Sequence, residues 1–516
     1  MKLGLWFAAI LALSPLVAHA ATPDWSIAVY AATDEEDLGP FGALMVKKLL
    51  RAPLSDRVQL LVEYDGFGNH GVKRAIRHGR GRAQTSQLVE HDSASPEALA
   101  AFFKWAADNS TGRHRLLVIG THSWGWKGII QDYTVPGRPD DNTLLPLRDF
   151  ARVLRESELH PDVLFFDSCI LGTVEAIDQL RGTARYIVAS ERETPYAGFP
   201  YSVLLTALGN GPVEPREVAR RIPEAYVAAF ARDGEYAKVE GEYDIVTTVA
   251  LDMANWDAFT RGYRDLVGAL KRAGLREVLR QQPQWPSRIW DGDHNVDIIE
   301  LLHRLPLLLP NDEVSTRAGE LATQLAYPSG AAEKSAQSFQ LDPARMSRFE
   351  LQLEGDENMS EQDALPSFKK AWQAANQDLP GLDALELAVV RSREQPSYLV
   401  RGTVTAPLEL RPWLPGTRHI RLSYIDREGN WQRRSFKRDE DYVAVTEFPP
   451  SSVLLAEAHS QGAPFIHGLG IDFFPLMEEN EERSEDAASG LSGPAFYKFL
   501  SWNRRTGWGD LILLRD

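Results

Sequence analysis

The first half of the chain alternates short apolar runs with segments in which apolar residues recur every three or four positions. The apolar runs predict strands at 25–32, 57–65, 115–120, 162–167 and 185–190. The segments between them predict helices at 39–50, 95–109, 146–158 and 171–182. Strands that alternate with helices indicate an α/β fold with a mostly parallel central sheet flanked by helices, in which ligands bind at the carboxyl ends of the strands.

The pattern changes twice further along the chain. Residues 214–327 are predicted to be mainly helical, whereas short runs after about residue 340 predict strands, with a hairpin turn at 428–430. We therefore expect a first domain at 21–335 and a small β-rich insertion or accessory unit at 336–462. Residues 463–516 are expected to return to the first domain.

The first twenty residues have the pattern of a secretory signal peptide. Lys2 precedes an apolar run that ends in the small-x-small sequence Ala18-His19-Ala20. A membrane anchor is the alternative, but the run is shorter than the ~20 apolar residues that span a bilayer. We expect cleavage near Ala20, a secreted or periplasmic protein, and no membrane span after the signal is removed.

The net charge and the cysteine count limit which partners and which chemistry are expected. The chain has 516 residues and a net charge of −16, so it is long enough for more than one structural unit and is poorly suited to bind nucleic acid. Cys169 is the single cysteine. An internal disulfide is therefore excluded, and the thiol is either an inert buried group or a reactive one. The sequence leaves the oligomeric state open.

Two predicted strand ends carry reactive side chains. His122 follows the strand at 115–120, and Asp167, Ser168 and Cys169 follow the strand at 162–167. If these strands are neighbours, both ends lie on one edge of the sheet. A thiolate there can attack an acyl carbonyl while the imidazole manages the proton, and nearby backbone N–H groups can stabilise the oxyanion. The alternative is a buried structural cysteine beside a structural histidine.

Several blocks of the chain resemble the clostripain-like cysteine peptidases, relatives of the caspases and gingipains in fold. "DWSIAVYAATDEEDL" stands where that family has W-T-x-x-x-Y and D-N-D-L, "HSWGW" where it has H-G-S-G-W, and "DSCILGTVE" where it has D-A-C-L-M-G-x-x-E. "ASE" and "GFPY" follow in the same order. Near the C-terminus, 467–475 and 499–508 resemble the closing strand and final helix of the family.

The resemblance implies a caspase-like sandwich and peptide-bond hydrolysis of a peptide or protein substrate. It makes Cys169 the nucleophile and His122 the acid and base. Asp167 then lies in the pocket for the side chain that precedes the scissile bond and favours arginine or lysine there, with Glu191 a weaker candidate for the same pocket. The oxyanion donors would be the N–H groups of Ser123 and Cys169.

One departure from the family pattern keeps two alternatives open. Ser123 replaces the glycine after the histidine, and its Cβ restricts the backbone near the substrate carbonyl. The chain could therefore be a catalytically weakened, peptidase-like binding protein. A serine hydrolase with Ser123 as nucleophile is a minor alternative, because Thr121 stands where the G-x-S-x-G elbow needs glycine.

The sequence predicts no required cofactor and no metal site. Residues 291–297 alternate acids as a calcium loop does, but Val296 and Leu302 stand where an EF-hand needs glycine and glutamate. Some members of the clostripain-like family respond to Ca²⁺, so the resemblance also allows a calcium site elsewhere.

Overall fold

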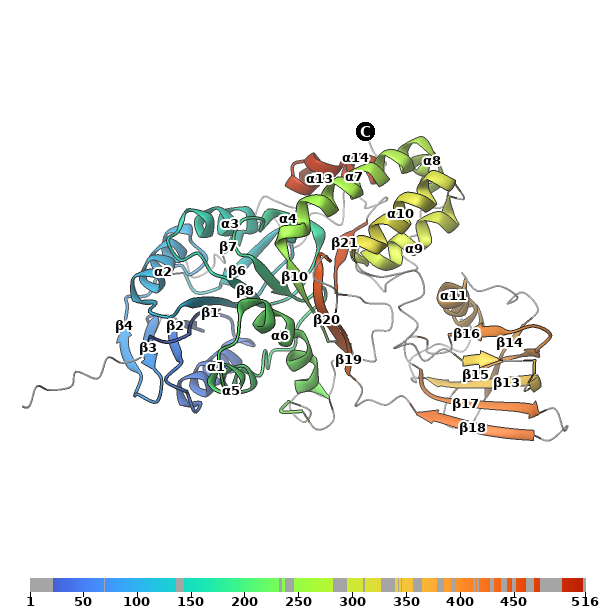
Figure 1. Cartoon of the computed structure of the whole chain (residues 1–516), viewed down its shortest axis with the longest axis horizontal. Coiled ribbons are helices and arrows are strands. Elements are labelled where there is room, and N and C mark those ends of the chain that lie inside the picture. Colours follow the sequence, from blue (N-terminus) through green and yellow to red (C-terminus); the bar gives the residue numbers. More distant parts are fainter. Residues whose placement is uncertain are drawn as a thin grey trace, which may run out of the picture.

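The fold is described from a computed structural model of the chain (Figure 1). It describes residues 22–513 except for 69, 136–142, 232–233, 237–245, 282–294, 310, 326–338, 342, 345, 356–363, 378–384, 392–395, 412–413, 415–416, 427–430, 438–442, 448–451, 461–467 and 474–493. The expected signal peptide at 1–20 lies outside the described residues.

A large mixed sheet forms the centre of the first domain. In spatial order its strands are β19 (Val443–Glu447), β20 (Leu454–Ser460), β10 (Thr247–Asp252), β9 (Tyr186–Ala189), β8 (Val163–Asp167), β5 (His114–Thr121), β1 (Trp25–Thr33), β2 (Val58–Gly66), β3 (Lys73–His78) and β4 (Gln84–Gln87). The five strands from β9 to β2 are parallel, and those added at both edges are antiparallel. The five parallel strands are those that the apolar runs predict.

Helices cover both faces of this sheet (Figure 1). One face packs against α2 (Pro96–Asn109), α3 (Leu147–Glu156) and α4 (Val174–Gln179). The other face packs against α1 (Gly39–Arg51), α5 (Tyr201–Gly209) and α6 (Pro215–Phe230). All nine residues of β1 are buried, as is usual for a central parallel strand between two helical layers. These observations confirm the predicted α/β fold class.

Local sequence signals explain where α2 begins. The Ser95 hydroxyl accepts a hydrogen bond from the Ala98 N–H at 3.2 Å, and Pro96 occupies the first helical position. Glu97 adds a negative charge to the first turn, where the helix dipole favours it. The predicted start of this helix is therefore confirmed.

A helical layer follows β10, as the pattern of residues 214–327 predicts. It contains a short 3₁₀ turn and four helices: η1 (Met253–Asn255), α7 (Trp256–Arg272), α8 (Leu275–Gln281), α9 (Ile298–Leu308) and α10 (Asp312–Gln324). The strand β10 itself interrupts the helical pattern. It pairs with β20 about two hundred positions later, so its neighbours along the chain give no signal of its partner.

The β-rich unit has its own small core. Its main sheet has the order β14 (Glu386–Arg391), β15 (Pro396–Thr403), β13 (Met346–Gly355), β17 (Thr417–Asp426) and β18 (Trp431–Lys437). The helix α11 (Ala364–Asn376) packs Phe368 and Trp372 against it, and β12 (Phe339–Leu341) pairs with β16 (Leu408–Leu410). β17 and β18 pair across the expected turn at 428–430, which itself lies outside the described residues.

The chain re-enters the large sheet earlier than the sequence predicts. The run at 442–448 is expected in the β-rich unit, but β19 and β20 are antiparallel members of the central sheet. The alternation of apolar residues identifies a strand but does not show which sheet the strand joins. The chain therefore returns to the first domain at β19 and not at residue 463.

The C-terminal segment packs on the helical face that contains α4. β21 (Gly470–Asp472) pairs with β11 (Asn295–Asp297), and α12 (Pro494–Tyr497), α13 (Ser501–Thr506) and α14 (Trp508–Ile512) follow. The buried carboxylate of Glu175 accepts hydrogen bonds from the Tyr497 hydroxyl and from the Asp472 N–H, which lies 3.1 Å away. The last residue of the "DSCILGTVE" block therefore holds this segment against the domain.

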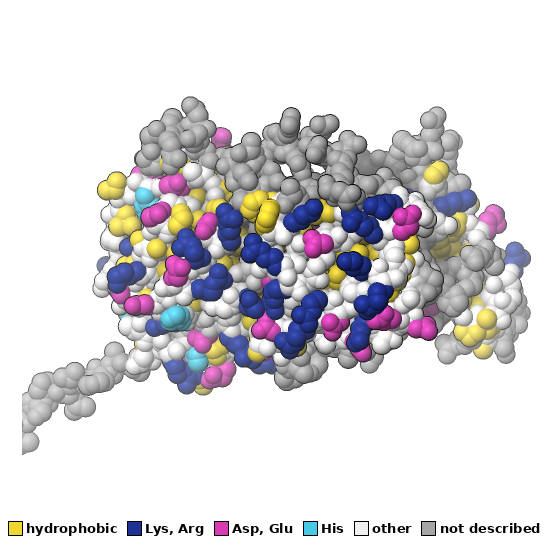
Figure 2. Space-filling model, turned by 90° about the horizontal axis from the view of Figure 1, so that it is seen from above, with side chains coloured by type: hydrophobic (Ala, Val, Ile, Leu, Met, Phe, Trp, Pro, Cys, Tyr) yellow, Lys and Arg dark blue, Asp and Glu magenta, His cyan; other side chains and the backbone are white. Residues whose placement is uncertain are grey.

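The surface charge is unevenly distributed. Figure 2 shows the upper face of the molecule, where Lys and Arg side chains gather although the chain is acidic overall. Arg148, Arg155, Arg181 and Arg504 line one cavity between α3, α4 and the C-terminal helices. None of the helices described here is both long enough and apolar enough to span a bilayer.

Candidate active site

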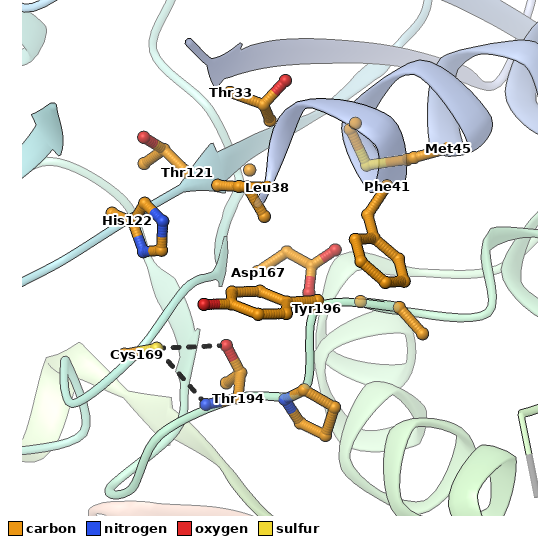
Figure 3. Close-up of a pocket in the computed structure, with 15 residues that line it drawn as sticks. Thr33, Leu38, Phe41, Met45, Thr121, His122, Asp167, Cys169, Thr194 and Tyr196 are labelled. Carbon is orange, nitrogen blue, oxygen red and sulfur yellow. Dashed lines mark hydrogen bonds between the residues drawn. The ribbon is translucent and has the colours of Figure 1, made fainter. Parts of the chain in front are cut away.

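The register between β5 and β8 brings the two predicted reactive strand ends together. Gly120 pairs with Asp167 across these parallel strands, and the Ser168 hydroxyl donates to the Thr121 carbonyl at 2.7 Å. His122 and Cys169 therefore leave the same edge of the sheet, and both line one pocket (Figure 3).

The Cys169 thiol is partly buried and contacts Thr194. Its sulfur accepts a hydrogen bond from the Thr194 N–H at 3.3 Å, and the Thr194 hydroxyl oxygen lies 3.5 Å away (Figure 3). Burial raises the pKa of this thiol, the two Thr194 contacts lower it, and the charges of Glu193 and Asp167 raise it further. The free thiol is therefore mainly protonated at neutral pH and needs a base before it can attack.

The backbone directly after Cys169 is strained. Ile170 has a φ of 51°, in the left-handed region that β-branched residues rarely adopt. Its N–H donates to the Arg192 carbonyl at 3.0 Å, and its own carbonyl faces Gly125, whose φ is 64°. A Cβ on Gly125 would lie 3.2 Å from that carbonyl oxygen. Strain of this kind persists where the surroundings fix the backbone, as these contacts do beside Cys169.

The imidazole of His122 contacts a carboxylate that sequence reasoning did not single out. Its Nε2 lies 2.8 Å from Oε2 of Glu35, in the acidic turn that follows β1. The ring of Tyr196 meets the imidazole edge-on, with the ring centroids 6.2 Å apart. Because β1 is the neighbour of β5, the strand-end rule applied to the DEED sequence (34–37) places these acids at the same sheet edge as His122, although it does not single out Glu35.

Asp167 forms the acidic part of the pocket. Its Oδ2 accepts hydrogen bonds from the Phe199 N–H at 3.0 Å and from the Tyr201 hydroxyl at 2.8 Å. Burial raises the pKa of this carboxyl, and the hydrogen bonds oppose that shift. Within the described ranges no Lys or Arg side chain forms an ion pair with it. Gly198 has a φ of 66°, and a Cβ there would lie 2.8 Å from Oδ2, so glycine is required for this close approach.

Glu191 does not line this pocket. Its side chain is 1% exposed and lies near Asp297 and Glu457, whose charges add to burial in raising the pKa of Glu191 well above its usual value. Glu191 is therefore a buried group that is absent from the lining of the pocket. The expectation that Glu191 shares the pocket with Asp167 is not reproduced by this placement.

Ser123 lies in a tight turn and its hydroxyl faces that turn. Its Oγ accepts from the Gly125 N–H at 3.2 Å and lies 3.4 Å from the Gly128 carbonyl. The chain then forms β6 (Gly128–Asp132), which pairs with β7 (Thr143–Pro146). A strand therefore follows Ser123 where the serine-hydrolase elbow requires a helix. Ser123 and Ile129 form a β-bridge whose hydrogen bonds are donated by Trp124 and Ile130, so the bridge does not use the Ser123 N–H.

The pocket is narrow. Its volume is about 40 Å³, which is room for a few water molecules. Thr194, Tyr196 and Gly198 form one wall, and Phe41 and Met45 of α1 face them.

These features define a class of protein. A free thiol and a histidine after adjacent parallel strands, with a carboxylate in the same pocket, are the arrangement of a caspase-like cysteine peptidase. Residues 45–273, a little less than half of the chain, match the model of the clostripain family, Peptidase_C11. This match confirms the family that the motifs indicate, and the matched residues form a cysteine-type endopeptidase domain of the clostripain family.

One solved structure extends the likeness of fold beyond the matched residues. A secreted C11 cysteine protease from Bacteroides thetaiotaomicron, in complex with an irreversible peptide inhibitor, is 15% identical, with a TM-score of 0.51 over 94% of this chain and 99% of that chain. A second structure from that organism, of the secreted C11 cysteine protease iotapain, is 14% identical, with a TM-score of 0.42 over 58% and 85% of the two chains. At this identity the first likeness concerns the fold alone. A comparison with curated proteins found no match.

Proposed function

We propose that the protein is a secreted cysteine endopeptidase that cleaves after arginine or lysine, with Cys169 as nucleophile and His122 as acid and base. The observation that supports this best is that both side chains line the same pocket as Asp167. Secretion rests on the signal-like sequence at 1–20 and would be tested by sequencing the N-terminus of the exported protein, where Ala21 is expected.

In the first step, His122 accepts the thiol proton and the sulfur of Cys169 attacks the peptide carbonyl carbon. The oxyanion that forms is stabilised by the N–H groups of Ser123 and Cys169. The C–N bond then breaks, the leaving amine takes the proton from the imidazolium, and a thioester remains on Cys169. A water molecule gives a proton to His122 and attacks the thioester, which releases the carboxylic acid and restores the thiol.

The buried carboxylate of Asp167 supports the preference for a basic side chain. A buried charge without a cationic partner is unfavourable, and an arginine or lysine side chain supplies that partner. The same side chain also neutralises one of the two charges that raise the pKa of Cys169. A basic substrate is therefore expected to promote ionisation of the thiol as it binds.

A catalytically weakened binding protein is the second candidate. Two observations favour it: the raised pKa of Cys169 and the pocket volume of about 40 Å³. The two candidates differ in whether the chain turns over substrate.

The test is hydrolysis of fluorogenic peptides that end in arginine, lysine or alanine. We expect the wild type to cleave the two basic peptides and Cys169→Ala to fall to background. Equal activity of wild type and Cys169→Ala contradicts the proposed nucleophile. Binding of basic peptides without turnover by the wild type would favour the binding protein.

A further inference from the structure

The geometry points to Glu35 as a positioning residue that fixes the orientation and the tautomer of His122. This inference rests on the proposed function, in which His122 is the base. It changes the predicted pair of Cys169 and His122 into a chain of three groups.

The contact between the two side chains is close and partly shielded from water. Oε2 of Glu35 lies 2.8 Å from Nε2 of His122, and the two side chains are 21% and 24% exposed. The same carboxylate oxygen accepts the Leu38 N–H at 3.0 Å. Two donors therefore converge on one oxygen, which fixes the carboxylate on the ring side of the turn.

The turn that carries Glu35 is held at both ends. The Glu35 N–H donates to the Thr33 carbonyl at 2.9 Å, and the Glu35 carbonyl accepts the Gly39 N–H at 2.8 Å. Gly39 begins α1, so the carboxylate lies at the N-terminus of a thirteen-residue helix, where the dipole favours negative charge. The fold thus supplies both the position and a favourable electrostatic surrounding for this side chain.

The neighbouring Asp34 anchors the same turn to the loops on either side. Its Oδ1 accepts the Gly68 N–H at 2.9 Å, and its Oδ2 accepts the N–H and hydroxyl of Thr134 at 2.7 and 2.6 Å. These contacts link the turn after β1 to the turn after β2 and to the segment after β6. A carboxylate presented from so constrained a backbone can hold a ring in one orientation.

The contact has a direct consequence for the proton on the ring. A carboxylate accepts hydrogen bonds, so the nitrogen that faces it, Nε2, carries the hydrogen in the neutral ring. Nδ1 then has the free lone pair and is the atom that accepts the thiol proton from Cys169. Without the carboxylate, the ring can populate the other tautomer, in which Nδ1 already carries a hydrogen and cannot act as a base.

Glu35→Gln tests this role, because the amide keeps the size of the side chain and removes its charge. Glu36→Gln is the matched control, since Glu36 is the exposed neighbour in the same turn. We expect kcat of Glu35→Gln to fall by at least about 10²-fold with KM within about threefold of the wild type, as for other catalytic histidines that lose their orienting carboxylate. Glu36→Gln should match the wild type.

A second measurement reports the tautomer without relying on turnover. In protein labelled with ¹⁵N-histidine, the His122 signals, assigned by their loss in His122→Ala, should show a protonated Nε2 in the wild type and a larger Nδ1–H population in Glu35→Gln. An unchanged tautomer, or a kcat of Glu35→Gln within threefold of wild type, would overturn the inference. Failure of the proposed function is separate, because it appears as activity that survives in Cys169→Ala.

Discussion

Thr194 contacts the sulfur of Cys169 with both its backbone N–H, at 3.3 Å, and its hydroxyl oxygen, at 3.5 Å. Burial raises the pKa of the Cys169 thiol, and these two contacts lower it. Both contacts oppose the cost of forming a thiolate in a narrow pocket.

Removal of the Thr194 hydroxyl should therefore slow the reactions of the thiol. In Thr194→Val the pKa of Cys169 rises further, so less thiolate is present at neutral pH and alkylation by iodoacetamide slows by about 3- to 10-fold. Thr194→Ser keeps the hydroxyl and should react at the wild-type rate. Equal rates for all three proteins across pH 6–10 would show that the hydroxyl does not influence the thiol.

Asp167 should determine the preference for a basic side chain. Asp167→Asn removes the charge and keeps the shape, so kcat/KM for lysine and arginine peptides should fall by about 10²- to 10³-fold, as expected for loss of a buried ion pair. The ratio of basic to alanine peptides measures the effect. Tyr201→Phe, which removes one hydrogen bond to Asp167, should keep the preference. An unchanged ratio in Asp167→Asn would place the specificity elsewhere.

Ser123 should be dispensable as a side chain. Its hydroxyl faces its own turn, so Ser123→Ala should keep kcat/KM within about threefold of the wild type, and the backbone N–H remains in place. Ser123→Gly restores the residue of the family pattern and should be at least as active. Loss of activity in Ser123→Ala, with survival in Cys169→Ala, would favour the serine-hydrolase alternative.

A buried group of carboxyls beside the turn of Glu35 should make stability depend on pH. Burial raises the pKa of Asp65 to about 7, and burial together with the hydrogen bond to Asp34 raises the pKa of Asp132 to about 8. Both values exceed the ~3.9 of an unfolded aspartate, so the native state binds more protons than the unfolded state between about pH 4 and pH 8. Stability from these groups is fully present below pH 4 and decreases as pH rises toward 8.

Asp132→Asn removes part of this dependence. The asparagine amide can donate to Asp34 at any pH, so the variant should be about 1 kcal/mol or more stable than the wild type at pH 8 and similar to it at pH 5. Urea unfolding at the two pH values measures the difference in the free energy of unfolding. A variant that is less stable at both pH values would contradict the raised pKa of Asp132.

The fold follows from the sequence only where local patterns carry the information. The five parallel strands and their helices have apolar runs and three- or four-residue spacings, and the prediction matches them. β10 and β20 are antiparallel additions from segments about two hundred positions apart. Their pairing depends on the assembled sheet edge, so no local pattern predicts it.

The candidate site, like the fold, is predictable from the sequence only in part. The strand-end rule brings His122, Cys169 and Asp167 together, because the register of adjacent parallel strands fixes the positions of the residues that follow them. Thr194 contacts Cys169 because it lies in the pocket wall that follows β9. The sequence does not identify it, since a neutral residue in a loop carries no motif and no charge. Glu35 is one of four consecutive acids, and only the observed turn distinguishes it from its neighbours.

Independence from metal ions follows from the proposed chemistry, in which every proton moves between Cys169, His122, water and substrate. Dialysis against EDTA should therefore leave kcat/KM within about twofold of the untreated enzyme. A loss that Ca²⁺ restores would instead show that a calcium site supports the active conformation.

The central claim is that Cys169 is the nucleophile of an enzyme for basic substrates. The most direct measurement is mass spectrometry of the protein after incubation with a peptide chloromethyl ketone that ends in lysine. We predict one adduct per chain, located on Cys169, together with complete loss of peptide hydrolysis, and no adduct in Cys169→Ala. An adduct on Ser123, or hydrolysis that persists after Cys169 is fully labelled, would contradict the account.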